Sequence, residues 1–310
     1  VRRVSTPVGC LVCLRGATIS AMRIADIAVR ARPVEKIAYV VAAALVVAGL
    51  VHVAILLATG ASWTGPTSLR KAATFGLSFG TTLASVAWVT SLLRVRARAL
   101  WLGLFTAACV VETVLVSLQA WRGVPSHLNF ATPADAAVAA TLAGGGAVIV
   151  VTGIVFGAAG FAGAAALAPD MRLAVRTGLV VLLVAFAAGA VMIAHGTVML
   201  RTDGPAVAYA TTGFLKPLHF VAMHAVLVLP ALAWLLRSTG SDDARRLAVV
   251  RVAVVADLLL TALVAVEAFA GIAPLAPPPA LGAATALALA VLVATGVLGA
   301  VTAIRRPART

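Results

Sequence analysis

Eight runs of apolar residues, each roughly 20 residues long, follow one another along this chain. A backbone that crosses lipid must satisfy its own polar groups, so such runs fold as helices or as closed β-barrels. The short alternating segments of a barrel are not visible in the sequence. The sequence therefore predicts an all-α, polytopic membrane helix bundle of about eight transmembrane spans, at residues 37–59, 69–93, 99–120, 134–158, 174–199, 216–236, 247–271 and 280–303.

Charge is scarce in this chain and unevenly placed. Only 11% of the 310 residues are charged and the mean hydropathy is +1.09, a balance that excludes a water-soluble globular surface. The net charge of +14 would suggest nucleic acid in a soluble protein, but here the arginines lie at span ends and in the tails. We therefore expect a lipid bilayer as partner and no nucleic acid.

The basic residues alternate between the two sides of the predicted spans. Arginine is concentrated in the connections at 94–98, 159–173 and 237–246, whereas the connections between them hold few basic residues. Basic loops stay in the cytoplasm, so the bias places both termini there, and an even number of spans agrees with it.

The chain divides into three parts by composition. Residues 1–36 are predicted to be a basic cytoplasmic arm, 37–303 a single transmembrane bundle and 304–310 a basic cytoplasmic tail. Met22 precedes an ordinary basic lead-in, so it is an alternative start to the chain.

The connection from Gln119 to Asp135 is the densest polar run in the sequence. It is too polar to enter lipid, and we expect it to cap a polar pocket on the extracytoplasmic side, where a small-molecule ligand would bind. The residues predicted to line or hold this pocket are Arg70, Lys71, Glu112, Gln119, Trp121, Arg122, Ser126, His127, Asn129 and Asp135, with Glu267 nearby.

Ionisable residues also lie inside the spans. By helix rise, His52, Glu112 and His224 each lie roughly 10–12 Å below their outer helix ends. Such groups are costly in lipid unless they face the bundle interior and one another, which predicts a shared site. The alternative is that each separately bridges two helices.

The histidines carry the first functional hypothesis, a haem- or metal-binding membrane redox protein. Imidazoles in an apolar cleft hold haem b, and His52, His195 and His224 are the leading ligands, with His219 beside them. Thioethers with imidazoles suit copper, and that alternative set is Met192, His195, Met199, Met223 and His224.

Two other classes of function stay open. In a proton-coupled transporter or permease, Glu112 would carry the proton, and Arg70, Lys71 and Arg122 would attract a small anionic solute. A non-enzymatic sensor or structural subunit would use the same residues for packing. Hydrolase chemistry is disfavoured, because Ser126 and His127 are adjacent but Asp135 is only a nominal orienting acid.

Three segments together resemble a family of bacterial polytopic membrane proteins. They are Leu69–Phe75, Gln119–Asn129 and Leu218–His224, which match the patterns Lys-Pro-x-Lys-Phe, Arg-Gly-x-x-Ser-His-Phe-Asn and His-Phe-x-x-x-His. The chain departs from these patterns at Ala72, at Thr74 and at Leu128. The resemblance brings no known activity; it implies a bacterial cytoplasmic (inner) membrane location and one outer-side unit. It gives no oligomeric state.

Overall fold

The computed structural model describes residues 31–273 and 276–304. In this part of the chain every regular element is a helix. The helices are α2 (Pro33–Thr59), α3 (Arg70–Ser91), α4 (Arg98–Trp121), α5 (Pro133–Ala162), α6 (Pro169–Thr202), α7 (Pro205–Thr211), α8 (Lys216–Ser238), α9 (Asp243–Phe269) and α10 (Pro279–Ile304). The predictions for Met22, for most of the arm 1–36 and for most of the tail 304–310 concern residues outside the described part of the chain.

The predicted all-α membrane fold is confirmed. Eight of the described helices are long and apolar enough to cross a membrane. They match the eight predicted spans in order, and their first and last residues differ from the predicted ones by a few positions. α6 begins at Pro169, five residues before the predicted start, because proline is favoured in the first helical turn. The short helix α7, outside the predicted spans, lies in the connection between α6 and α8.

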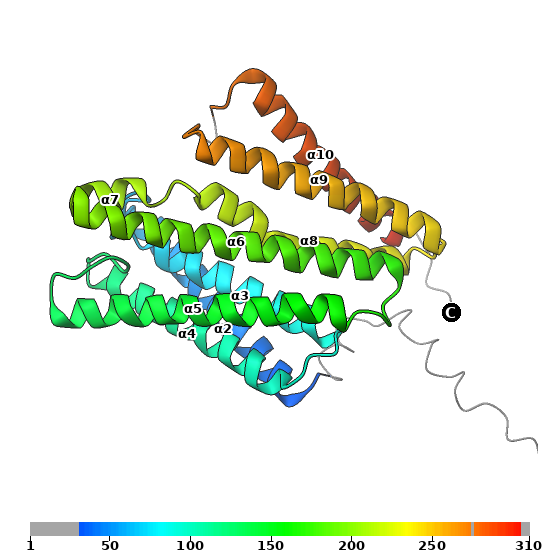
Figure 1. The fold of residues 1–310 in the computed structure, drawn as a ribbon, viewed down its shortest axis with the longest axis horizontal. Helices are drawn as coiled ribbons and strands as arrows, with labels where there is room; N and C mark the ends of the chain where they lie inside the picture. The colour runs from blue at the N-terminus through cyan, green and yellow to red at the C-terminus, as the bar shows by residue number, and fades with distance from the viewer. Residues whose placement is uncertain (1–30, 274–275, 305–310) are drawn as a thin grey trace, which may run out of the picture.

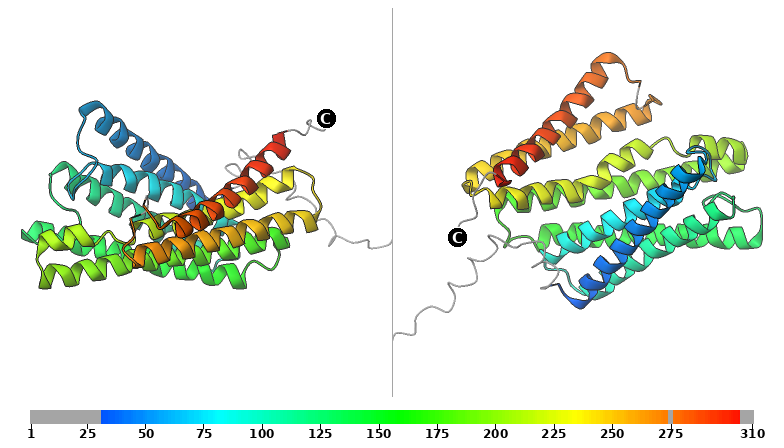
Figure 2. Two further views of the ribbon diagram at one scale, coloured as in Figure 1. Left: turned by 90° about the horizontal axis from the view of Figure 1, so that it is seen from above. Right: turned by 180° about the vertical axis from the view of Figure 1, so that it is seen from behind.

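The long helices connect two ends of the bundle (Figure 1). We call the end with the connections 92–97, 163–168 and 239–242 the inner end, and the end with the connection 122–132 the outer end. Arginines lie in or beside the inner-end connections: Arg94, Arg96, Arg172, Arg237, Arg245 and Arg246. α8 packs against α3, α6, α9 and α10. α2 packs on α3 and α4, and the α9–α10 hairpin lies at the opposite edge (Figures 1 and 2).

α2 and α3 approach each other closely through glycine. A Cβ on Gly76 would lie 2.7 Å from the Cα of Gly49, and a Cβ on Gly80 would lie 2.7 Å from the Ala42 carbonyl oxygen. In lipid there is little hydrophobic gain between helices, so small residues that permit close backbone contact favour association. This contact fixes α2 against the helix that carries Arg70 and Lys71.

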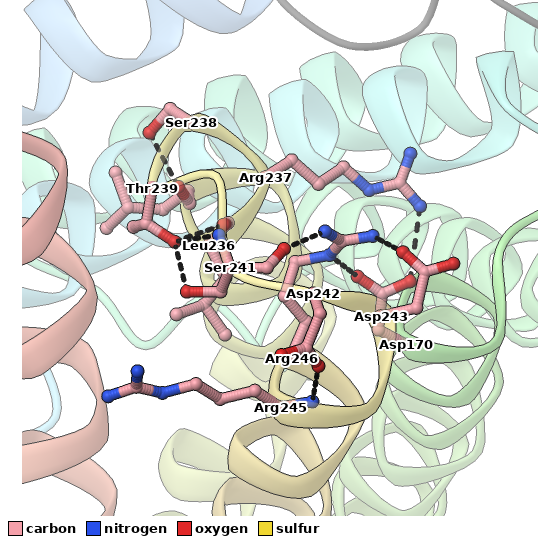
Figure 3. A network of polar contacts seen from close by, with 11 residues as sticks. Asp170, Leu236, Arg237, Ser238, Thr239, Ser241, Asp242, Asp243, Arg245 and Arg246 are labelled. Carbon is pink, nitrogen blue, oxygen red and sulfur yellow. Dashed lines mark hydrogen bonds and ion pairs between the residues drawn. The ribbon is translucent and has the colours of Figure 1, made fainter.

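Buried ion pairs tie helices together at the inner end. Asp170 of α6 pairs with Arg237 of α8 and Arg246 of α9, each at 3.3 Å (Figure 3). Glu35 of α2 pairs with Arg98 of α4 at 3.2 Å. Both carboxylates are almost fully buried, so these contacts join elements far apart in the sequence.

Candidate functional site

The loop between α4 and α5 is held by a carboxylate at the start of α5. Arg122 donates to Asp135 at 2.7 Å, and Gln119 Nε2 donates to the same oxygen at 3.1 Å. Thr132 caps α5 by accepting from the Asp135 backbone N–H at 3.1 Å. The sequence predicts Arg122 as a pocket cation that attracts an anion and Asp135 as a further pocket residue, but in the structure the two side chains form an ion pair with each other.

Two further contacts fix the middle of this loop. Leu128 adopts a left-handed backbone conformation with φ of 59°, and Tyr209 of α7 donates to its carbonyl oxygen at 3.1 Å. Burial raises the pKa of the Tyr209 phenol, and the negative charge of Asp135 adds to this effect. Asn129 accepts from the Ala131 backbone N–H at 3.2 Å, which closes a local turn.

Four predicted residues form a series of polar contacts that passes through the loop, which we call the polar chain. Lys71 Nζ donates to Ser126 Oγ at 3.0 Å, and Ser126 Oγ lies 3.0 Å from His127 Nδ1. His127 Nε2 lies 3.9 Å from Glu112 Oε2. The polar chain therefore runs from Lys71 at the start of α3, through the loop, to the Glu112 carboxyl group inside α4. Glu112, rather than Asp135, is the carboxyl group that faces His127.

The hydrogen bonds of the polar chain have one direction, because Lys71 fixes which groups donate. Lys71 can only donate, so Ser126 accepts from it and keeps its own proton for His127 Nδ1. The ring proton then lies on Nε2 and points toward Glu112. Burial, together with the positive charge of Lys71, lowers the pKa of His127 to about 3. The imidazole is therefore neutral at physiological pH.

Glu112 occupies a tight position between α4 and α5. It is 4% exposed, and its Oε1 has no hydrogen-bond partner among the described residues. A Cβ added to Gly145 of α5 would lie 2.6 Å from that oxygen, whereas Gly144 and Gly146 face open space. Gly145 thus makes room for the carboxyl group.

Three cations gather at the outer end near this chain. Arg70 and Lys71 begin α3, Lys216 begins α8, and the charges of all three act on one another. Arg70 Nε donates to the Trp63 carbonyl oxygen at 2.6 Å. Within the described residues, none of the three cations forms an ion pair with a carboxylate, although two helix N-termini add further positive potential.

His52 lies apart from the polar chain. Trp121 Nε1 donates to His52 Nε2 at 3.0 Å, and His52 Nδ1 bonds the Ala48 carbonyl oxygen at 2.7 Å. Both ring nitrogens are thus in hydrogen bonds. The structure does not bring His52, Glu112 and His224 into the predicted shared site. His52 contacts Trp121, Glu112 faces His127, and His224 bonds Phe220.

The other histidines belong to the region of α6 and α8. His195 packs edge-on against Phe214, with ring centroids 5.1 Å apart. His219 Nδ1 bonds the Ala185 carbonyl oxygen of α6 at 2.7 Å. His224 Nδ1 bonds the carbonyl oxygen of Phe220 at 2.6 Å, one turn earlier in the same helix.

No group of three or more His, Cys, Asp or Glu residues that could hold a metal occurs in residues 31–273 and 276–304. Met192 and Met223 pack against hydrophobic clusters. Glu267 accepts from Thr285 of α10 at 2.7 Å, so it stabilises the α9–α10 hairpin. Haem b and copper remain predictions, testable by the absorption spectrum and metal content of the purified protein.

Two residues of the site were absent from the predicted set. Lys216 joins Arg70 and Lys71 because α7 and the turn after it bring the start of α8 to the start of α3. Gly145 lies in a Gly-Gly-Gly run that gives no sign of which glycine faces Glu112. The only available signal for Lys216 was its position as a basic residue in an outer connection.

Comparisons with protein-family models, with curated proteins and with solved structures found no match to this chain.

Proposed function

We propose that the protein binds a small anionic solute at the outer end and couples its movement across the membrane to a proton. The observation that carries this proposal is the cation cluster of Arg70, Lys71 and Lys216 joined to a buried carboxyl group through Ser126 and His127. Clustered cations at two helix N-termini attract anions.

Lys71 is the group through which the two events are coupled. Its ammonium group donates to Ser126 and belongs to the cation cluster. An anion that binds Lys71 competes with Ser126 for the ammonium protons. The Ser126 hydroxyl and His127 then reorient, which changes the polar environment that faces Glu112.

Glu112 is the proposed proton carrier. A buried carboxyl group inside a span is costly as a free anion, and intramembrane acids commonly serve as proton relays. The neutral imidazole of His127 can accept a proton on one nitrogen and give one up on the other. The proton would therefore pass between the outer surface and Glu112 through the His127 ring.

Proton flux in proteoliposomes tests the proposal. Vesicles with an internal pH dye are mixed with inorganic phosphate, sulfate or succinate, and the internal pH is followed. We expect at least one anion to drive proton uptake, and Glu112→Gln to reduce that uptake about tenfold or more. Lys216→Gln should raise the half-saturating anion concentration about fivefold, equivalent to about 1 kcal/mol.

Matched variants distinguish an effect of the proposed site from the effect of removing any nearby positive charge. Arg201→Gln removes an exposed cation near the outer end of α6 and should leave proton uptake unchanged. Gly145→Ala crowds Glu112 and should impair uptake, whereas Gly146→Ala adds a methyl group in open space and should not. The proposal is wrong if none of the three anions changes the proton flux and Glu112→Gln leaves it unchanged.

A further inference from the structure

An open surface cavity of about 610 Å³ lies at the inner end, between the start of α2 and the connection from α3 to α4. Four arginines line it: Arg32, Arg94, Arg96 and Arg98. This region lies at the opposite end of the bundle from the cation cluster (Figure 1). It is independent of the proposed transport function.

The four arginines differ in how far they are engaged. Arg98 is 9% exposed, pairs with Glu35 and donates to the Leu93 carbonyl oxygen. Arg32 also pairs with Glu35, at 2.9 Å. Arg94 and Arg96 are exposed, and no side-chain hydrogen bond or ion pair of theirs occurs among the described residues.

Glu35 is the one carboxylate that pairs with these arginines in the described residues. Two helices begin at the cavity wall, α2 at Pro33 and α4 at Arg98, and both direct the positive end of the helix dipole toward it. The cavity therefore combines an excess of positive charge with two helix N-termini, which is the arrangement that binds phosphate.

The apolar part of the cavity wall bears on the source of the phosphate. Val34, Leu93 and Val95 line the same cavity as the arginines. If the arginine-rich side is cytoplasmic, as the charge bias predicts, the cavity lies at the level of the lipid headgroups. Basic pockets between membrane helices at this level bind anionic lipid headgroups.

We infer that the inner-end cavity is a binding site for a phosphate monoester or diester group, with the headgroup of an anionic phospholipid as the fitting ligand. Arg94 and Arg96 bind the phosphate oxygens. Arg98 and Arg32, held by Glu35, fix the wall. A Cβ on Gly163 would lie 2.8 Å from the backbone of Arg94, so the end of α5 holds the arginine loop in place.

Thermal unfolding of the delipidated protein in detergent tests the site. The probes are phosphatidylglycerol, phosphatidylcholine and soluble glycerol 1-phosphate at constant ionic strength. We expect phosphatidylglycerol to raise Tm, and Arg94→Gln/Arg96→Gln to weaken its apparent affinity about thirtyfold. Native mass spectrometry should show the bound lipid in the wild-type chain and its loss in the variant.

The control is Arg172→Gln/Arg245→Gln, which removes the same charge from the same end outside the cavity. It should keep the wild-type response, and Arg96→Gln alone replaces the double variant if that fails to fold. A response to glycerol 1-phosphate at equal concentration would assign the phosphate to a soluble ester, and a response to phosphatidylglycerol alone would assign it to a lipid. The inference is overturned if neither phosphatidylglycerol nor glycerol 1-phosphate raises Tm, if phosphatidylcholine raises it as much as phosphatidylglycerol does, or if the control loses as much affinity as the double variant.

Discussion

At the scale of single residues, position in the polar chain decides what each group can do. His127 and His52 are both imidazoles near the outer end, yet they differ in their partners. His52 bonds a tryptophan and a backbone carbonyl, whereas His127 connects a serine bonded to Lys71 with a buried glutamate. Only His127 therefore links a cation to an acid inside a span.

The neutral state of His127 makes a prediction about pH. Its pKa of about 3 lies below the value of 6.5 for an exposed imidazole, so the unfolded chain takes up this proton first on acidification. The contribution of His127 to the unfolding free energy is fully present above pH 6.5 and is lost as the pH falls from 6.5 toward 3. At pH 5 the loss is about 2 kcal/mol.

Solid-state ¹⁵N NMR of labelled histidine checks this state directly. We expect His127 to show a neutral ring with the proton on Nε2 at pH 5, identified by comparison with His127→Gln. Lys71→Gln should raise the pKa of His127, because it removes a repelling positive charge. An imidazolium signal from His127 at pH 5 in the wild-type chain would contradict the prediction.

At the scale of elements, glycines determine how closely neighbouring helices pack. Gly49, Gly76 and Gly80 bring the backbones of α2 and α3 together, and Gly163 brings the end of α5 against the Arg94 backbone. Gly145 instead faces the end of a side chain, Glu112. Replacing Gly49, Gly76, Gly80 or Gly163 by alanine should therefore disturb helix packing, whereas replacing Gly145 should disturb the position of the Glu112 carboxyl group.

Gly76→Ala tests the backbone contact between α2 and α3. The added Cβ would lie 2.7 Å from Gly49, and backbone cannot move aside as a flexible side chain can. We expect a loss of about 1–3 kcal/mol in unfolding free energy, measured by denaturation in mixed micelles. Gly103→Ala, whose Cβ meets open space, is the matched control and should change stability little. Equal effects of the two substitutions would rule out the close contact as the cause.

At the scale of the whole molecule, the two ends of the bundle use charge differently. At the inner end, buried carboxylates pair with arginines from separate helices and close the bundle (Figure 3). At the outer end, the cations Arg70, Lys71 and Lys216 have no carboxylate partner in the described chain. The paired arginines of the inner end thus hold the helices together, whereas the three cations of the outer end stay available to a solute.

Asp170→Asn tests the cohesion of α6, α8 and α9. Arg237 and Arg246 are each about 15% exposed and would lose their shared carboxylate, so we expect a loss of about 3 kcal/mol, or a fall in Tm of roughly 6–12 °C. Asp243→Asn removes a carboxylate that is 79% exposed and should cost below about 1 kcal/mol. A Tm unchanged by Asp170→Asn would show that the network does not hold the helices.

The sequence by itself determined the membrane bundle, because apolar runs of this length have no other stable environment. It also located the polar loop, because polar groups are excluded from lipid. The tertiary structure decided which polar residues meet. Arg122 and Asp135 neutralise each other, Glu112 faces His127, and Lys216 joins Lys71. Depth along a helix can be counted from sequence, but the rotation of each helix and its neighbours depend on packing among all the spans.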